Sequence, residues 1–405
     1  MIGSLQGIRV LELIRVGPAA YCTQLLADMG AEVLKVETPS ALDQTSGSGS
    51  SPTKENRRLA AANPVNRNKK SIAINLKAPE GQEILRKLAS GYDVLVEGFR
   101  PGVMARLGGD YETLSKLNPG LIYCSLSGYG QDGPYRDFPA HDANFISLGG
   151  VLKLIGERDR MPVMPLNLVA DYAGAALHGM IGILLAVIAR THTGRGQMVD
   201  ISYLDTVIGL LGATFAAKDF FTEGKIAERG AGSFSGEFPH HAILETKDGG
   251  MVSLACTEPW IWENFCRAIG RMDLNRFHAE ADHFERFANE EEKRVTEELR
   301  GIFKTKTRDE WFDLLTKADV CVGKLYNIKE VFEDPHVKYR KMLVEIDDPE
   351  LGKIGQPGIA VKLSDTPGSV RSLSPTLGEH TGEVMTALGY TSDQIEALRQ
   401  KRIIL

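Results

Sequence analysis

The chain has 405 residues, and its 47 lysines and arginines against 53 aspartates and glutamates give a formal net charge of −6. This length predicts two or three domains with enough chain to bury a core. A composition of 43% hydrophobic and 25% charged residues excludes a wholly disordered chain. The acidic balance also argues against a generic nucleic-acid-binding protein, which needs a basic face for phosphates.

Cysteine spacing and apolar run lengths indicate the compartment. The five cysteines are scattered and form no C-x-x-C pair, which favours reduced thiols and gives no zinc-site spacing, so we expect no metal. The first residues lack the basic start and apolar segment of a secretory signal. The longest apolar stretch, residues 180–188, is far shorter than the roughly 20 residues that span a bilayer. We therefore expect a cytoplasmic enzyme that does not cross a membrane.

The first part of the chain alternates strand and helix patterns. Residues 7–13 predict a strand, 19–29 a helix ended by Gly30, and 31–37 a second strand, which together form a βαβ unit and imply a parallel sheet. Further elements follow: strands at 71–76, 93–97 and 121–126, and a helix at 79–89. The first turn carries Gly17-Pro18 in place of G-x-G-x-x-G, so a dinucleotide-binding dehydrogenase is excluded.

A loop and a basic stretch interrupt this pattern. Residues 40–52 are rich in serine and glycine and predict a loop. Seven basic residues then occur with a single acid, Glu55; they are Lys54, Arg57, Arg58, Arg67, Lys69, Lys70 and Lys77. On charge alone this stretch is either a phosphate-binding patch or a solvated face.

The later part of the chain predicts a second, different architecture. The sequence predicts an apolar helix at 170–189, a strand at 198–203 and a helix at 204–218. A hairpin at 240–244 and 251–255, charged helices at 289–305 and 308–317, tail strands at 343–346 and 359–363, and a helix at 379–388 follow. We predict a large α/β domain over 1–224, a small α+β domain over 225–330, and a tail over 331–405 that returns to the large domain.

Four features could carry chemistry. The glycine-rich turn 127–135, which contains Tyr129 and Gly130, follows a strand and allows close backbone approach to a ligand. His141 is either a structural histidine or a base. Asp171 begins the apolar helix and is either a helix-start acid favoured by the helix dipole or a nucleophile or base. Glu258, followed by a proline, also has a helix-start interpretation.

Short motifs in a fixed order carry a resemblance to a known family. They are found at residues 8–13, 25–37, 66–72, 96–102, 128–134, 193–197, 355–358 and 377–381. These motifs are distributed over nearly the whole chain. In this order they resemble the motifs of the class III CoA-transferase family. That family includes formyl-CoA transferase, the carnitine CoA-transferases and α-methylacyl-CoA racemase.

The resemblance implies a fold, an assembly and a ligand. It implies a large Rossmann-like domain built from both chain ends, a small domain, and two ring-like chains interlocked as a dimer. It also implies that coenzyme A binds on the large domain as the thioester substrate, with no prosthetic group. By position, the best candidates for contacts to coenzyme A are Lys35, Arg67, Lys69 and Arg106, and the turn with Tyr129 and Gly130 adds to them.

The family divides into two chemistries at the position of Asp171. In its transferases the aligned aspartate attacks the acyl-CoA carbonyl, whereas in its racemases it exchanges the proton α to the thioester together with a histidine and an assisting glutamate. This chain has the full racemase-type set, namely His141, Asp171 and Glu258. It also lacks the four-glycine run of formyl-CoA transferase, since residues 230–236 read GAGSFSG. We therefore expect racemase-type chemistry first, CoA transfer second, and a non-catalytic subunit of a heteromeric transferase third.

Overall fold

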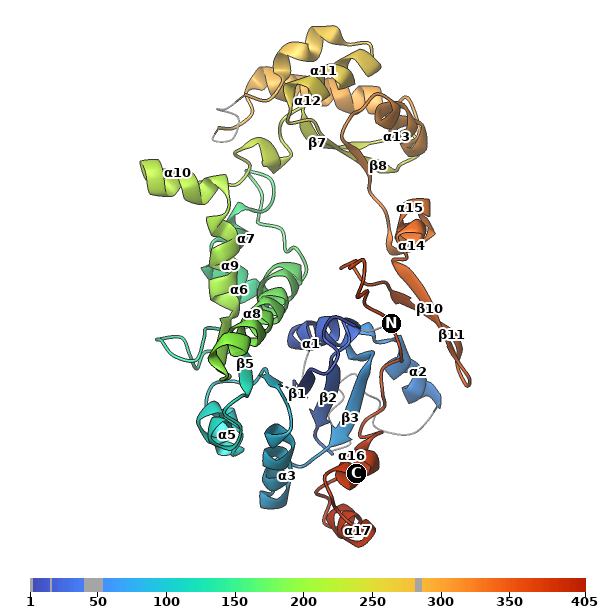
Figure 1. The fold of residues 1–405 in the computed structure, drawn as a ribbon. Helices are drawn as coiled ribbons and strands as arrows, with labels where there is room; N and C mark the ends of the chain where they lie inside the picture. The colour runs from blue at the N-terminus through green and yellow to red at the C-terminus, as the bar shows by residue number, and fades with distance from the viewer. Residues whose placement is uncertain (1–2, 15–16, 40–53, 281–285) are drawn as a thin grey trace. The chain divides into compact units, whose positions relative to one another are not determined.

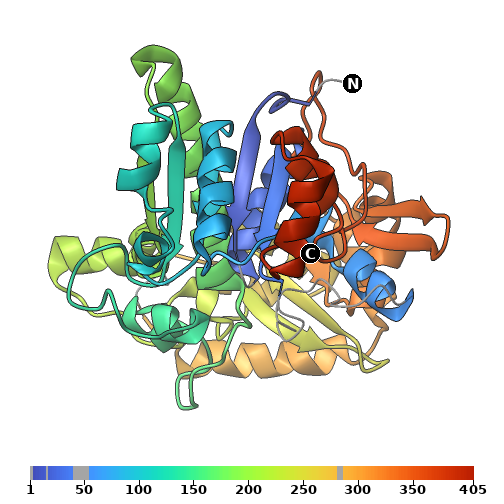
Figure 2. The same ribbon diagram turned by 90° about the horizontal axis from the view of Figure 1, so that it is seen from below.

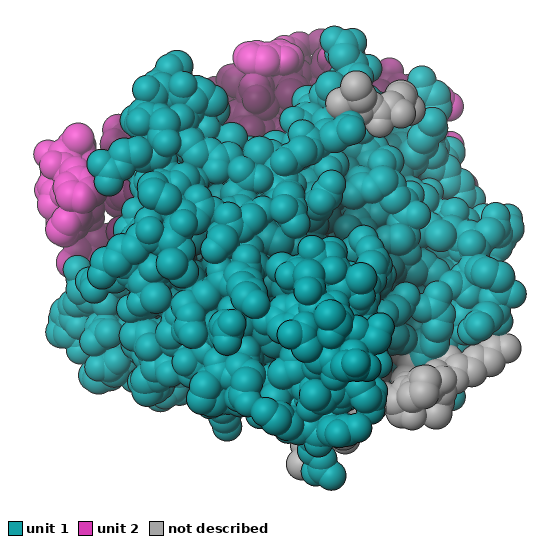
Figure 3. Space-filling view, turned by 60° about the horizontal axis from the view of Figure 1, so that its bottom comes forward, with its two compact units in different colours: residues 1–146, 166–207, 334–405 teal, residues 147–165, 208–333 magenta. Residues whose placement is uncertain are grey.

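The structure is a computed structural model that describes residues 3–14, 17–39, 54–280 and 286–405. Two compact units make up the chain: unit 1 contains Met1–Ile146, Leu166–Val207 and Asp334–Leu405, and unit 2 contains Ser147–Pro165 and Ile208–Glu333 (Figure 3). The small unit therefore begins earlier than the predicted residue 225 and includes a segment from before Asp171. The loop predicted at 40–52 lies outside the described residues.

Unit 1 is built on one parallel sheet of six strands in the order β3-β2-β1-β4-β5-β6 (Figure 1). The strands are β1 (Arg9–Leu13), β2 (Glu32–Glu37), β3 (Lys69–Ala73), β4 (Val94–Glu97), β5 (Ile122–Ser127) and β6 (Met198–Ser202). In the central register Leu11 lies beside Leu34 on one side and Leu95 on the other. The predicted parallel α/β sheet is confirmed, and its strand order reverses between β1 and β4, where such sheets place their ligands at the carboxyl edge.

Helices cover both faces of this sheet, so its strands are buried on both sides. One face packs against α1 (Pro18–Asp28) and α8 (Leu177–Thr193). The other packs against α3 (Pro79–Ser90), α5 (Tyr111–Leu117) and the C-terminal helices α16 (Thr381–Ala387) and α17 (Ser392–Gln400), which lie beside the first strands in Figure 2. Unit 1 is thus formed by both ends of the chain.

The remaining elements of unit 1 are short. They are α2 (Lys54–Ala62), a 3-10 turn (Pro64–Asn66), α4 (Val103–Arg106), α6 (Asp142–Leu148, which ends just inside unit 2), a π-helix (Leu168–Ala176), α15 (Pro335–Tyr339) and the hairpin β10 (Leu343–Asp348) and β11 (Gly352–Pro357). The strand predicted at 359–363 is wrong, because residues 352–357 fold back at once onto β10 and the following residues form no strand.

Unit 2 contains an antiparallel sheet in the order β7-β8-β9. Its elements are α7 (Val151–Leu154), α9 (Tyr203–Gly212, which begins in unit 1), α10 (Phe215–Glu223), β7 (His241–Glu245), β8 (Met251–Ala255), α11 (Pro259–Ala268), α12 (Glu290–Phe303), α13 (Arg308–Lys317), β9 (Val322–Lys324) and α14 (Ile328–Glu333), with 3-10 turns at Ser233–Ser235 and Met272–Phe277. The predicted hairpin is confirmed. The core of unit 2 contains a series of stacked, buried aromatic rings, those of Trp262, Phe265, Phe303 and Trp311.

Candidate active site

Asp171 lies in the π-helical segment Leu168–Ala176, which leads directly into α8. Tyr172, the next residue, packs its ring at 5.6 Å from that of Tyr21 near the start of α1, so this segment lies at the carboxyl edge of the sheet. Gly174 permits the close packing, because a Cβ there would be 2.7 Å from the hydroxyl oxygen of Thr206. Single π-helical turns inside longer helices occur frequently at functional sites.

Asp142 holds the backbone of this segment. Its side chain is 4% exposed, and its Oδ2 accepts hydrogen bonds from the backbone N–H groups of Ala170 at 2.8 Å and Asp171 at 3.0 Å. N–H groups at a helix start have no partner within the helix, so this carboxylate supplies one. Sequence reasoning did not select Asp142; an acid directly beside His141 was the only signal that pointed to it.

The carboxyl group of Asp171 is half-buried and accepts a hydrogen bond from Nδ2 of Asn167 at 3.0 Å. Burial raises its pKa above the ordinary value, and the charge of Asp142 raises it further. The Asn167 hydrogen bond and the charge of His141 act in the opposite direction. A raised pKa suits a carboxyl group that must take and give a proton near neutral pH.

His141 is exposed and immediately precedes α6. Its backbone N–H donates to Oδ1 of Asn144 at 3.0 Å, and its carbonyl accepts from the Asn144 N–H at 2.8 Å. The backbone of the histidine is therefore fixed while its ring remains accessible. Because its charge affects the pKa of Asp171 and its neighbour Asp142 binds the Asp171 backbone, the structure brings these two predicted residues together within unit 1.

Glu258 lies in unit 2, directly before Pro259 at the start of α11, as its helix-start interpretation predicts. Its side chain makes no hydrogen bond to the first turn of that helix, and Oε2 accepts one from the Thr257 hydroxyl at 3.2 Å. The carboxyl group is thus not used as a cap. Its predicted partnership with His141 stays a prediction from the resemblance.

The turn with Tyr129 and Gly130 follows β5 at the carboxyl edge of the sheet. Gly130 is buried with a φ of +88°, a left-handed conformation that favours glycine. The ring of Tyr129 lies 5.3 Å from Phe145, 5.7 Å from Tyr135 and 6.5 Å from Phe138. Tyr129 therefore belongs to an aromatic cluster that fixes the turn.

A buried carboxyl group, Glu97 at the end of β4, connects two loops of the same edge. Its Oε2 accepts the backbone N–H of Phe99 at 2.8 Å, and its Oε1 accepts the Ser125 hydroxyl. Nε2 of Gln131 in turn donates to the Ser125 oxygen at 2.7 Å, and the Gln131 backbone N–H donates to Oδ2 of Asp200 at 3.0 Å. Burial raises the pKa of Glu97 to about 7. Sequence reasoning did not select this network.

Three of the four basic residues predicted to contact coenzyme A are buried in ion pairs. Lys35 is 2% exposed and lies 2.9 Å from Glu37. Arg67, 1% exposed, binds Asp28 at 2.6 Å, and Lys69, 3% exposed, binds Glu12 at 2.6 Å. Their predicted role does not match these surroundings, because each charge is directed to an internal carboxylate. Spacing alone did not distinguish a buried pair from a phosphate contact.

Arg106 differs from those three. It is exposed at the end of α4, and within the described part of the chain its guanidinium group makes no ion pair or side-chain hydrogen bond. It is the one of the four that presents its charge to solvent.

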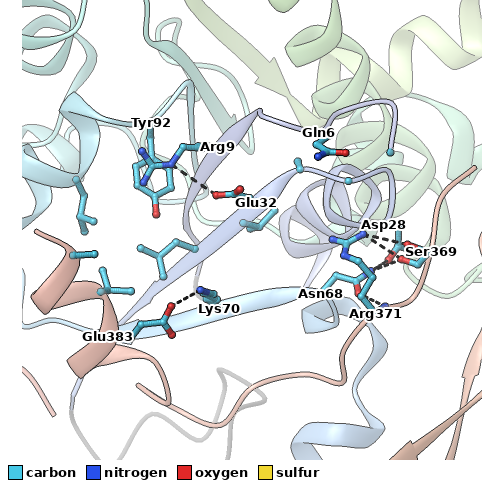
Figure 4. Close-up of a pocket in the computed structure, with 18 of the residues that line it drawn as sticks. Gln6, Arg9, Asp28, Glu32, Asn68, Lys70, Tyr92, Ser369, Arg371 and Glu383 are labelled. Carbon is cyan, nitrogen blue, oxygen red and sulfur yellow. Dashed lines mark hydrogen bonds and ion pairs between the residues drawn. The ribbon is translucent and has the colours of Figure 1, made fainter. Parts of the chain in front are cut away.

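A cavity of about 580 Å³ lies on unit 1 where β1 and β2 begin, away from the carboxyl edge (Figure 4). Two of its cations are paired: Lys70 and Glu383 point toward each other at 2.6 Å, and Arg9 lies 4.0 Å from Glu32 and over the ring of Tyr92. A third, Arg371, donates to the backbone carbonyl of Ala27 at 2.8 Å. The carboxylates of Asp28, Glu32 and Glu383 also line the cavity, so it is not a strongly basic site for an anion.

Two properties of the described residues concern metals and membranes. No group of three or more His, Cys, Asp or Glu side chains gathers there to hold a metal ion. One helical stretch, Leu168–Thr193, is long and apolar enough to cross a membrane by length and composition, with a mean hydropathy of 1.9, and a third of that window is buried. A core helix of a soluble protein meets the same criterion, so the stretch alone is weak support for a membrane span.

Comparisons with known proteins show which family this chain resembles. The profile of CoA-transferase family III matches residues 5–381. The beta subunit of succinyl-CoA–L-malate CoA-transferase from Chloroflexus aurantiacus is 38% identical over 99% of this chain and 98% of that protein. Alpha-methylacyl-CoA racemase from Homo sapiens is 31% identical over 99% and 97%. The crystal structure of a CAIB/BAIF family protein from Brucella suis superposes with a TM-score of 0.79 at 29% identity, covering 96% of this chain and all of that one.

Proposed function

Because the chain belongs to CoA-transferase family III, we propose that it transfers the proton at the carbon α to an acyl-CoA thioester from one face of that carbon to the other. The observation that carries this proposal is the pair formed by exposed His141 and half-buried Asp171, which are joined through Asp142. Racemisation needs two proton-transfer groups on opposite faces of a planar enolate, and these two side chains come from different segments at one edge.

The proposed steps conserve atoms and charge. One group takes the α proton, and the C–H electron pair becomes the enolate, whose negative charge develops on the thioester oxygen. The other group, protonated at the start, gives its proton to the opposite face of the carbon. The raised pKa of Asp171 brings it closer to that of an imidazole, so either direction is accessible. Glu258 remains a predicted assistant to the histidine.

A second candidate is CoA transfer, which the 38% identity to a CoA-transferase subunit favours. Here the Asp171 carboxylate attacks the thioester carbonyl and the thiolate of coenzyme A leaves, forming a mixed anhydride. The thiolate then attacks the aspartyl carbonyl, releasing the carboxylic acid and leaving an aspartyl thioester on the enzyme. His141 would then only position the substrate.

The assembly we propose is a dimer with a second copy or with a homologous subunit. The side chains of Leu177, Ile181, Leu185 and Ile188 form one exposed face of α8, with 39–61% of each accessible. Such a continuous apolar face marks an interaction surface. Light scattering of the native protein checks this, and a monomer near 44.3 kDa would contradict it.

The deciding experiment is α-proton exchange. A single enantiomer of a 2-methylacyl-CoA is incubated in heavy water, and both deuterium incorporation and stereochemistry are followed. We expect exchange with inversion in the wild type. Asp171→Asn and His141→Gln should each abolish inversion, since one remaining base cannot serve both faces, while exchange persists for only the enantiomer that faces the remaining base.

A matched control and a trapping experiment separate the alternatives. His192→Gln removes another exposed histidine, at the end of α8, and should leave inversion unchanged. Hydroxylamine added with acyl-CoA traps an aspartyl anhydride or thioester only under the transfer mechanism. Trapping at Asp171 without exchange would refute the proposed racemisation and favour the second candidate; neither signal would indicate a non-catalytic subunit.

A further inference from the structure

Tyr203 lies where three segments of the candidate site meet. It begins α9 directly after β6, at the carboxyl edge of the sheet. Its ring packs at 5.1 Å on the ring of Phe145 in α6, the helix that follows His141. The next backbone N–H, that of Leu204, donates to the carbonyl of Gly128 in the glycine-rich turn at 3.2 Å. The backbone beside Tyr203 is therefore joined to the turn, and its ring to the segment of His141.

The third segment is the π-helix that contains Asp171. Thr206, one turn along α9, donates its hydroxyl to the carbonyl of Tyr203 at 2.8 Å. The same hydroxyl oxygen lies 2.7 Å from the point where a Cβ on Gly174 would stand, so α9 and the π-helix are in close contact. All of these residues belong to unit 1. The position of Tyr203 beside both predicted proton-transfer groups is thus fixed by packing within one unit.

The hydroxyl of Tyr203 remains protonated and is not used by the protein. Burial raises its pKa above the ordinary value, and the charge of Asp171 raises it further. Near neutral pH the group is therefore a hydrogen-bond donor and not a base. Within the described residues this hydroxyl makes no hydrogen bond, and its side chain is only partly buried. Most buried side-chain polar atoms have a partner, so this donor is left for a molecule bound beside Asp171.

The proposed reaction requires a donor at the oxygen on which negative charge develops. His141 and Asp171 do not supply it, because both act at the α carbon. We propose that the Tyr203 hydroxyl donates a hydrogen bond to the carbonyl oxygen of the acyl-CoA thioester, a bond that strengthens as the enolate forms. The proton stays on the phenol, since burial and the neighbouring carboxylate both oppose a phenolate. This inference rests on the proposed function, to which it adds a catalytic residue that no sequence motif indicated.

The first test is the rate of α-proton exchange in heavy water. Tyr203→Phe removes the hydroxyl and keeps the ring that packs on Phe145. With a 2-methylacyl-CoA, kcat should fall about 100-fold, as for loss of one donor to a developing oxyanion. The ratio kcat/KM should fall with it, because the contact acts mainly in the transition state. Tyr111→Phe is the matched control, since Tyr111 begins α5 on the opposite face of the sheet, and it should exchange at the wild-type rate.

A second measurement separates a substrate contact from a structural role. Infrared difference spectra of bound acyl-CoA, labelled with carbon-13 at the thioester carbonyl, report hydrogen bonding to that oxygen, which lowers its stretching frequency. We expect a higher frequency in Tyr203→Phe than in the wild type and Tyr111→Phe. An unchanged frequency would overturn the proposal even if exchange is slower, and so would wild-type exchange in Tyr203→Phe. A wild type without exchange would refute the proposed racemisation, while the carbonyl frequency of its acyl-CoA complex would still decide the role of Tyr203.

Discussion

Substitution of Glu97 by glutamine tests the buried network that joins the loop after β4 to the glycine-rich turn after β5. Glu97 is 4% exposed, and burial raises its pKa from an ordinary 4.5 to about 7, with the charge of Asp200 adding to the increase. Hydrogen bonds from Ser125 and from the Phe99 backbone partly oppose this. Glutamine has the same shape and can still accept the Phe99 N–H, so Glu97→Gln removes the titration while it leaves the packing unchanged.

The size and sign of the expected effect follow from the two pKa values. Because the pKa of Glu97 is higher in the folded protein, the folded state binds more protons between pH 4.5 and about 7. The stability contributed by protonated Glu97 is fully present below pH 4.5 and is lost as the pH rises through about 7. With about 1.4 kcal/mol for each pH unit, the total loss is about 3 kcal/mol.

The assay is urea unfolding of wild type and Glu97→Gln at a series of pH values from about 5 to about 8.5. The difference between the two free energies of unfolding cancels the other titrating groups. We expect this difference to shift in favour of the glutamine variant by about 2–3 kcal/mol over the series. Glu112→Gln, which removes an exposed carboxyl group on α5, shows the effect of a surface substitution. A difference independent of pH would refute the raised pKa and the buried titrating network.

Three further substitutions test the candidate site and the buried residues that hold its backbone in place. Arg67→Met leaves the carboxylate of Asp28 buried without its cation, so the free energy of unfolding measured without coenzyme A should fall by about 3–5 kcal/mol. Asp142→Asn keeps an oxygen for the two backbone N–H groups but removes the charge, so the pKa of Asp171 should fall, as measured by carbon-13 NMR of its carboxyl group. Gly174→Ala puts a methyl group where no space exists, and should destabilise the π-helical segment by about 1–3 kcal/mol and reduce activity.

Controls for these substitutions are available in the same chain. Arg106→Gln removes an exposed arginine and should leave unfolding unchanged, which separates a ligand contact from a buried support. Gly209→Ala adds a methyl group where nothing lies within 4 Å and should be tolerated. Loss of coenzyme A binding by Arg67→Met without loss of stability would contradict the structural role of Arg67, and an unchanged Asp171 pKa would contradict the electrostatic role of Asp142.

Most of the fold could be predicted from hydrophobic periodicity and turn residues. The buried parallel strands β1 (RVLEL) and β2 (EVLKVE) are rich in valine and leucine, and the hairpin β7–β8 has a K-D-G-G turn between two strands, so local patterns were sufficient. The three-residue strand β9 is too short to show a period and is recognised only by its pairing with β8. The wrongly predicted strand at 359–363 has a β-like composition but lacks a partner strand, which is a tertiary property.

The candidate site was harder to predict from the sequence, because a basic residue does not reveal whether it pairs with a buried carboxylate or contacts a ligand. Arg67 and Lys69 stand in a basic stretch, yet the carboxylates that pair with them, Asp28 and Glu12, lie 39 and 57 residues earlier in the sequence. Lys35 pairs with Glu37 on its own strand. Arg106, in contrast, is exposed at the end of α4 and makes no ion pair within the described residues. Whether a basic residue is a buried ion-pair partner or a ligand contact depends on its burial. Burial is set by how the folded chain packs.

The two sequence interpretations of Asp171, helix-start acid and reactive group, differ in what its carboxylate binds, and Asp142 bears on this difference. An aspartate at a helix start usually spends its carboxylate on backbone N–H groups. Here the carboxylate of Asp142 accepts the N–H groups of Ala170 and Asp171. The Asp171 carboxylate instead accepts a hydrogen bond from the neutral side-chain amide of Asn167. The same carboxylate raises the pKa of Asp171 by its charge. One buried acid therefore both fixes the backbone and adjusts the proton affinity of the proposed reactive group, so a substitution at Asp142 that preserves the hydrogen bonds separates the two effects.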